Sequence, residues 1–182
     1  MKKKLNSINK NITDNTSEWI QKYLFKVNKN KILLDLASGN GRHSIYAESK
    51  GYKVISADLN LFKLKNIPKI SNLYKININF EKKYNWPFID KCFDTIIVTN
   101  YLHRDIFKKI INSLKQNGLL IYETFSIENK TFGRPNNQKF LLKPQELFYL
   151  AKNNKMKILN YEEIIINFPI KKAIQRICAK KL

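Results

Sequence analysis

The chain has 182 residues, 43% of them hydrophobic, and a formal net charge of +20. This length predicts one domain, residues 1–182, with a proper core, and residues 1–14 are expected to be flexible. No apolar run approaches the ~20 residues that a membrane-spanning helix needs. The basic first residues are followed by polar ones, so the start does not read as a secretory signal. We therefore expect a cytoplasmic protein without a membrane partner.

The positive charge suggests nucleic acid as a partner, because a basic surface attracts phosphate without reading sequence. Of the 34 Lys and Arg residues only four are Arg, so 30 are Lys, in a chain that is also rich in Asn and Ile. These are amino acids of AT-rich codons, and the charge can equally reflect the genome. Cys92 and Cys178 lack metal-ligand spacing, so we expect core packing for both and no metal site.

Hydrophobic periodicity and turn residues predict alternating helices and strands. An entry helix is expected over residues 15–28, because its apolar residues recur at helical spacing after polar starters. The strands are then expected over residues 32–36, 53–57, 73–77, 93–99, 119–125, 157–166 and 173–180, and the remaining helices over 42–50, 61–66, 104–116 and 144–154. This alternation indicates a doubly wound α/β sheet. The last two strands have no helix between them, which predicts an antiparallel edge hairpin.

The segment 32–43, followed by a second strand that ends in Asp58, is the most informative part of the chain. A dinucleotide-binding fingerprint would require a glycine where Arg42 stands, so NAD is not favoured. The small residues instead alternate after Asp35, at Ala37, Gly39 and Gly41. This pattern resembles motif I of class I S-adenosylmethionine-dependent methyltransferases. The resemblance implies a Rossmann-like, seven-stranded, mostly parallel sheet and S-adenosylmethionine as cofactor.

The same resemblance assigns roles around this turn. Asp35 is placed to meet the ammonium of the methionine moiety, directly or through water, and Asp58 to accept two hydrogen bonds from the ribose hydroxyls. Each acid has an alternative role as a helix cap. The glycines allow close approach of the ligand to the backbone. The complete set of expected cofactor-binding residues is Asp35, Ala37, Ser38, Gly39, Gly41, Asp58, Leu59, Asn79, Phe80 and Asn100.

Asn79 and Phe80 occupy the place after the third strand where such enzymes contact adenine, often through an Asp. An amide can still pair with the adenine amino group, and the nearby Trp86 can equally belong to the core. The segments 98–104, 122–125 and 132–135 resemble a small bacterial subgroup near the tellurite-resistance type of methyltransferase. The resemblance covers the chain from about Lys31 onward.

The loop after the fourth strand is where this fold places its reaction chemistry, because strand carboxyl ends face the crevice. Asn100 and Tyr101 are expected against the methionine end of the cofactor. His103 is a candidate general base with an ordinary pKa of ~6.5, and its alternative is a capping or surface histidine. The candidate catalytic residues are His103, Asn100 and Tyr101.

Three further side chains are candidates for substrate binding: Arg104, Glu123 and Arg134. Arg134 is the natural anion clamp, and its alternative is a surface ion pair with Glu123 or Glu128. We interpret His43 as a packing residue and Arg176 as a structural residue.

The sequence thus predicts a methyltransferase that acts on a small molecule. The alternatives are an RNA or protein methyltransferase, or a non-catalytic, nucleic-acid-binding member of the fold. Methyltransferases of exocyclic base amines carry an Asn or Asp followed by two prolines and an aromatic residue after the fourth strand. Here Asn100 is followed by Tyr101 and Leu102, which argues against that reaction.

Overall fold

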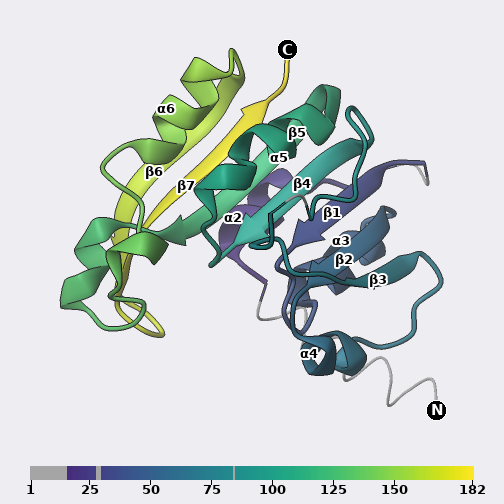
Figure 1. Ribbon diagram of the computed structural model, residues 1–182, viewed down its shortest axis with the longest axis horizontal. Helices are drawn as coiled ribbons and strands as arrows, with labels where there is room; N and C mark the ends of the chain where they lie inside the picture. Colours follow the sequence, from purple (N-terminus) through teal and green to yellow (C-terminus); the bar gives the residue numbers. More distant parts are fainter. Residues whose placement is uncertain (1–15, 28–29, 84) are drawn as a thin grey trace. The chain divides into compact units, whose positions relative to one another are not determined.

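A computed structural model describes residues 16–27, 30–83 and 85–182 (Figure 1). The chain divides into two compact units, residues 1–85 and 86–182. The segment 1–14, which we expected to be flexible, lies outside the described residues, and the single-domain interpretation stays a prediction. No helix in the described ranges is long and apolar enough to cross a membrane.

The first unit contains three parallel strands in the order β3-β2-β1. Its elements are α2 (Glu18–Tyr23), β1 (Ile32–Leu36), α3 (Arg42–Ser49), β2 (Lys53–Asp58), α4 (Leu61–Asn66) and β3 (Leu73–Asn77). Leu33, Leu34 and Leu36 of β1 have no exposed surface. A strand that is covered on both faces needs such a continuous apolar run, which is why β1 was recognisable in the sequence.

The second unit contains four strands in the order β4-β5-β7-β6. Its elements are β4 (Phe93–Thr99), η1 (Arg104–Ile106), α5 (Phe107–Ser113), β5 (Leu114–Phe125), η2 (Ile127–Thr131), η3 (Gln138–Phe140), α6 (Glu146–Asn153), β6 (Lys157–Ile166) and β7 (Lys172–Lys180). β4 and β5 are parallel, whereas β7 is antiparallel to both β5 and β6. The predicted antiparallel hairpin at the sheet edge is therefore confirmed.

The predicted helix over residues 104–116 is wrong at its end. A short 3₁₀ turn leads into α5, which stops at Ser113, and Leu114 already pairs with Phe93 as the first residue of β5. The ammonium of Lys181 donates hydrogen bonds of 2.7–3.0 Å to the carbonyls of Ile111, Asn112 and Leu114. These bonds add to the Leu114 N–H that donates to the Ile111 carbonyl and cap the carbonyl end of α5. The chain turns into β5 at this point although its sequence continues with good helix formers.

The predicted helix over residues 15–28 is also too long. α2 has six residues and begins at Glu18, where the Ser17 hydroxyl accepts the Trp19 N–H. Two contacts join its start to α3, from the Thr16 hydroxyl to the Arg42 carbonyl and from the Ser17 N–H to Nε2 of His43. The contacts with α3 and the Ser17 cap therefore fix the start of α2. The apolar residues of the sequence keep helical spacing over a longer segment than the one that is helical in the structure.

His43 is a packing residue, as the sequence indicated. Its side chain is 1% exposed, and Nε2 accepts the Ser17 N–H at 3.4 Å. Burial, together with the nearby charge of Arg42, lowers the pKa of His43 to about 3. The imidazole is therefore neutral in the folded chain at any pH near 7, which is the form that can accept this hydrogen bond.

We expect His43→Gln to remove part of the acid sensitivity of the fold. The unfolded histidine takes up a proton below pH ~6.5 and the folded one does not, so wild-type stability is complete above that pH and falls as the pH drops toward 3. A Gln amide can still accept the Ser17 N–H but does not titrate. Urea unfolding at pH 7.5 and pH 5.0 should show a loss about 2 kcal/mol greater in wild type than in the variant. Equal losses would contradict a neutral, buried His43.

Candidate functional site

The loop after β1 bends sharply at the carboxyl end of the first unit's sheet. Ala37, Gly39 and Gly41 all have left-handed backbones, with φ of 57°, 58° and 74°. A Cβ on Gly41 would lie 2.6 Å from the side chain of Ile67, whereas nothing lies within 4 Å of a Cβ on Gly39. Gly41 is thus required by packing and by its backbone. At Gly39 the space is open, which leaves room for a ligand beside the loop.

Asp58 ends β2 and fixes this loop. Its Oδ2 accepts the Gly39 N–H at 2.8 Å and its Oδ1 accepts the Asn60 N–H at 2.7 Å. The Asn77 amide at the end of β3 donates to the Asp58 and Leu59 carbonyls. The carboxylate is half-buried and rigidly held, and each of its oxygens can accept a second hydrogen bond. This arrangement fits a pair of ribose hydroxyls.

Asp35 lies near the end of β1 and has no exposed surface. Its Oδ2 accepts the Ser44 hydroxyl at 2.6 Å, whereas its Oδ1 has no hydrogen-bond partner among the described residues. Burial raises the pKa of Asp35 to about 7, against lowering contributions from the Ser44 hydrogen bond and the Arg42 charge. A buried carboxylate oxygen without a partner is costly. An ammonium, directly or through one water, would satisfy it, so the residue fits the cofactor's methionine end.

The two residues expected near adenine, Asn79 and Phe80, and the cofactor-binding candidate Leu59 differ in exposure. Leu59 is 61% exposed, Phe80 is 5% exposed and Asn79 is half-buried. Oδ1 of Asn79 accepts the Glu81 N–H at 2.9 Å, which leaves its amide hydrogens for another partner. Trp86 donates to the Ser113 hydroxyl and packs edge-on against Phe88 in the second unit, which favours its interpretation as a core residue.

In the second unit, the segment that follows β4 is held by its backbone. Asn100 is exposed and adopts a left-handed backbone with φ of 52°, while its N–H donates to the Glu123 carbonyl at 2.9 Å. The buried hydroxyl of Tyr122 donates to the Tyr101 carbonyl at 2.9 Å. His103 is half-buried and directly precedes η1. The candidate catalytic side chains thus extend from a backbone fixed at two successive residues.

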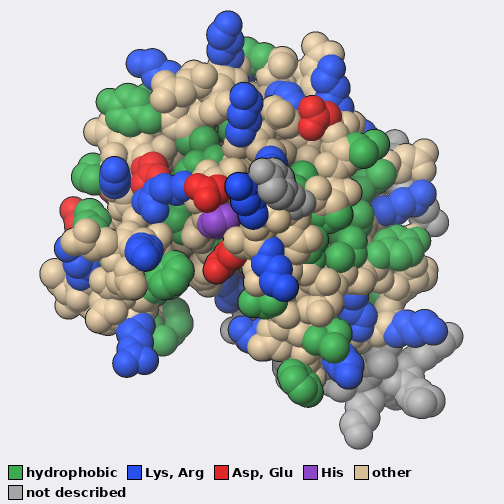
Figure 2. Space-filling view, in the orientation of Figure 1, with side chains coloured by type: hydrophobic (Ala, Val, Ile, Leu, Met, Phe, Trp, Pro, Cys, Tyr) green, Lys and Arg blue, Asp and Glu red, His purple; other side chains and the backbone are tan. Residues whose placement is uncertain are grey.

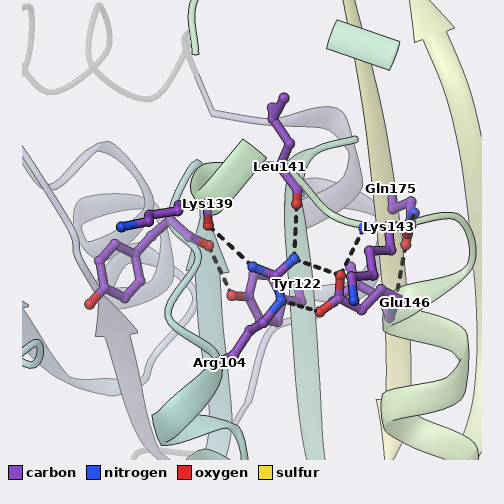
Figure 3. A network of polar contacts seen from close by, with 9 residues as sticks. Arg104, Tyr122, Lys139, Leu141, Lys143, Glu146 and Gln175 are labelled. Atoms are coloured by element: carbon purple, nitrogen blue, oxygen red, sulfur yellow. Dashed lines mark hydrogen bonds and ion pairs between the residues drawn. The ribbon is translucent and has the colours of Figure 1, made fainter. Parts of the chain in front are cut away.

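Arg104 forms a network of hydrogen bonds within the protein (Figure 3). Its guanidinium forms a bidentate pair with Glu146, at 2.6 and 2.8 Å, and donates to the carbonyls of Lys139 and Leu141. Four of its five N–H groups are used in this way. Arg104 therefore ties the start of η1 to α6 and to the segment that precedes α6, and this engagement speaks against its predicted role as a substrate ligand.

The remaining two candidates for substrate binding differ from each other. Glu123 on β5 is 3% exposed and lies 3.9 Å from Nη1 of Arg176, which itself donates two hydrogen bonds to Glu162. Arg176 is thus structural, as expected. Arg134 is exposed and forms no ion pair in the described part of the chain. The alternative that it pairs with Glu123 or Glu128 is not what the structure shows.

A family model identifies the family of this chain. The model for tellurite resistance protein TehB matches residues 2–164. The chain belongs to this family. Membership confirms the predicted enzyme class, a class I S-adenosylmethionine-dependent methyltransferase near the tellurite-resistance type, and its cofactor. No curated protein matches the chain.

Solved structures confirm the fold. An S-adenosylmethionine-dependent methyltransferase from Mesorhizobium loti is 13% identical with a TM-score of 0.73, and the match covers 93% of this chain and 100% of that one. TehB from Haemophilus influenzae is 20% identical with a TM-score of 0.62, over 83% of this chain and 57% of that one. Geranyl diphosphate C-methyltransferase from Streptomyces coelicolor A3(2) is 12% identical with a TM-score of 0.68, over 91% and 76%.

We expect Asp58→Ala to weaken binding of S-adenosylhomocysteine by about 1.5–3 kcal/mol, because charged hydrogen bonds to the ribose are lost. Isothermal titration calorimetry measures the change. Since the Ala variant also frees the Gly39 N–H, Asp58→Asn is the matched control: its amide oxygen can keep one backbone bond while the charge is removed. Unchanged affinity in both variants would exclude the ribose role of Asp58.

Proposed function

We propose that this methyltransferase transfers the methyl group of S-adenosylmethionine to a small-molecule acceptor. The cofactor part of this proposal rests on two acids at the ends of adjacent parallel strands. Asp58 is already oriented by two backbone N–H groups, and Asp35 has one buried oxygen without a hydrogen-bond partner in the described part of the chain. The proposed cofactor-binding residues are Asp35, Ala37, Ser38, Gly39, Gly41, Asp58, Leu59, Asn79, Phe80 and Asn100.

The cofactor, when bound, supplies a methyl group on a sulfonium, which is already an activated leaving group. The protein therefore has to orient the acceptor, exclude water and, for a weakly acidic acceptor, remove a proton. We assign orientation to Asn100 and Tyr101, because their backbone is held by Glu123 and Tyr122. His103 is the proposed base, since it directly follows this fixed segment and a neutral imidazole can accept a proton from the acceptor.

The guanidinium of Arg134, which is exposed and forms no ion pair with the residues that the structure describes, supports an acceptor that carries a negative charge. A guanidinium binds carboxylate or phosphate through two parallel hydrogen bonds. Geranyl diphosphate C-methyltransferase, which has the same fold, was solved with the small anionic molecule geranyl diphosphate. Arg104 serves a different purpose, because its charge is already matched by Glu146.

The alternative acceptors, RNA and protein, would draw on the lysine-rich surface. On the face that Figure 2 shows, Lys and Arg side chains are dispersed among hydrophobic and acidic ones instead of gathering in one patch. Some lysines also have structural partners: Lys75 donates to two carbonyls at the end of α4, as Lys181 does at the end of α5. This dispersion favours the small-molecule proposal, because a nucleic-acid site concentrates its basic residues.

The experiment that tests the proposal is incubation of the protein with methyl-labelled S-adenosylmethionine and fractionated cell extract. Small molecules, RNA and protein are separated before labelling. We expect label in the small-molecule fraction, and more of it in the part that an anion-exchange resin retains. Asp58→Ala protein serves as the control for background labelling. Label that enters only RNA or protein would overturn the small-molecule proposal in favour of that alternative.

Once the acceptor is known, two variants distinguish the proposed anion-binding role of Arg134 from the proposed role of His103 as a base. Arg134→Lys should mainly raise the KM for the acceptor, because a point charge cannot reproduce a bidentate fork. His103→Ala should lower turnover by about 10²-fold or more while cofactor affinity is kept, because proton removal is lost. Steady-state kinetics and calorimetry measure both. Wild-type kinetics in both variants would place the acceptor elsewhere and leave the cofactor assignment intact.

A further inference from the structure

A chain of three buried serines joins Asp35 to the glycine loop of the first unit. Asp35 of β1 is in register with Ser56 of β2, and α3 places Ser44 within reach of both side chains. The Ser44 and Ser56 hydroxyl oxygens lie 2.9 Å apart, and those of Ser56 and Ser38 lie 2.8 Å apart. All four side chains are at most 8% exposed. A continuous hydrogen-bonded path therefore leads from the carboxyl group to Ser38 in the loop.

The direction of this chain depends on the proton of Asp35. Each serine hydroxyl has one hydrogen to donate. When Asp35 is ionised, Ser44 donates to it, Ser56 donates to Ser44 and Ser38 donates to Ser56. When Asp35 is protonated and donates to Ser44, every hydroxyl turns, and Ser38 presents a donor to the loop instead of an acceptor. The members of such a chain polarise one another, so the two arrangements are favoured over mixed ones.

The balance between these arrangements is close at neutral pH. Burial favours the neutral acid, as does the negative charge of Asp58 on β2, whereas the Ser44 hydroxyl and the positive charge of Arg42 on α3 favour the carboxylate. The neighbouring His43 of α3 is neutral and contributes no charge. Oδ1 of Asp35 has no hydrogen-bond partner among the described residues. A cation that binds this oxygen would shift the ionisation equilibrium of Asp35 toward the carboxylate.

We propose that Ser44 is a positioning residue for the cofactor: it holds Asp35 in the orientation and ionisation that the methionine ammonium requires, so that cofactor binding is coupled to release of a proton. This inference rests on the proposed role of Asp35 toward that ammonium. The neutral carboxyl group loses its proton to solvent, the carboxylate pairs with the ammonium of the cofactor, and the serine chain turns toward Asp35. No covalent bond to carbon or sulfur changes.

The test is calorimetric titration between pH 6 and pH 7, where the cofactor's amine stays charged, in two buffers with different enthalpies of ionisation. Three ligands are compared: S-adenosylmethionine, S-adenosylhomocysteine and 5′-methylthioadenosine, which lacks the amino-acid tail. We expect the first two to release a fraction of a proton and to bind about fivefold more tightly at pH 7 than at pH 6. Methylthioadenosine should release none and keep its affinity.

Ser44→Ala breaks the chain beside Asp35. It should shift the pH profile for S-adenosylhomocysteine toward higher pH and weaken binding at pH 7 by about threefold to tenfold, with methylthioadenosine unaffected. Ser56→Ala leaves the Ser44 contact to Asp35 in place and should shift the profile less. Ser49→Ala is the matched control, because Ser49 lies on the same helix with an exposed hydroxyl bonded only to the Tyr46 carbonyl in the described structure.

The outcomes separate this inference from the proposed function. A pH-independent affinity, or an equal response of methylthioadenosine, would overturn the inference while leaving the methyltransferase assignment in place. If Ser44→Ala does not fold, two measurements still test the inference: the proton release of the wild-type protein and the pH dependence of S-adenosylhomocysteine binding to Ser56→Ala. Failure of all three ligands to bind would instead overturn the assignment of the cofactor site itself.

Discussion

The hydrogen bond from the Gly39 N–H to Asp58 is the constraint on which the cofactor half of this enzyme depends. It joins the loop after β1 to the end of β2 at 2.8 Å, and the Ser38 N–H to Ala57 carbonyl bond reinforces it. Because the loop is closed in this way, α3 begins at Arg42 and places Ser44 over the Asp35 side chain. A ligand that approaches Asp58 therefore meets a loop whose shape is already set, and little ordering of the backbone remains to oppose binding.

The sequence predicted this half well because its signals are local. A run of apolar residues, small residues in alternation and an acid at the next strand end lie within 27 residues of one another, from Ile32 to Asp58. The conformations of Ala37, Gly39 and Gly41 follow from those same positions. All seven predicted strands are present, since β-branched and apolar runs bounded by turns identify buried strands without reference to the rest of the chain.

The errors arise where distant residues decide. α5 ends at Ser113, where Leu114 pairs with Phe93 and Lys181, 70 positions after Ile111, caps the carbonyl end of the helix. The ion pair of Arg104 with Glu146, 42 positions later, also depends on distant residues. Neither contact produces a periodic pattern in the sequence from which it could be predicted. The serine chain was missed for a related reason: Ser56 is a polar residue within an apolar strand, which is a signal, but its partner Ser44 follows only from the register of β1 and β2 and the position of α3.

The segment that carries Arg134 shows how a surface loop can present a side chain in a defined place. Buried Asn129 donates to the Pro135 carbonyl and accepts the Ala173 N–H, so the loop is tied to β7 directly beyond Arg134. On the preceding side, the Gly133 N–H donates to the Asn129 carbonyl at 3.2 Å. The backbone of this segment is therefore fixed at both ends while the guanidinium between them stays exposed. A backbone held in this way needs little further ordering when the side chain binds a ligand, and this supports the proposal of Arg134 as an anion-binding residue over a general attraction for negative charge.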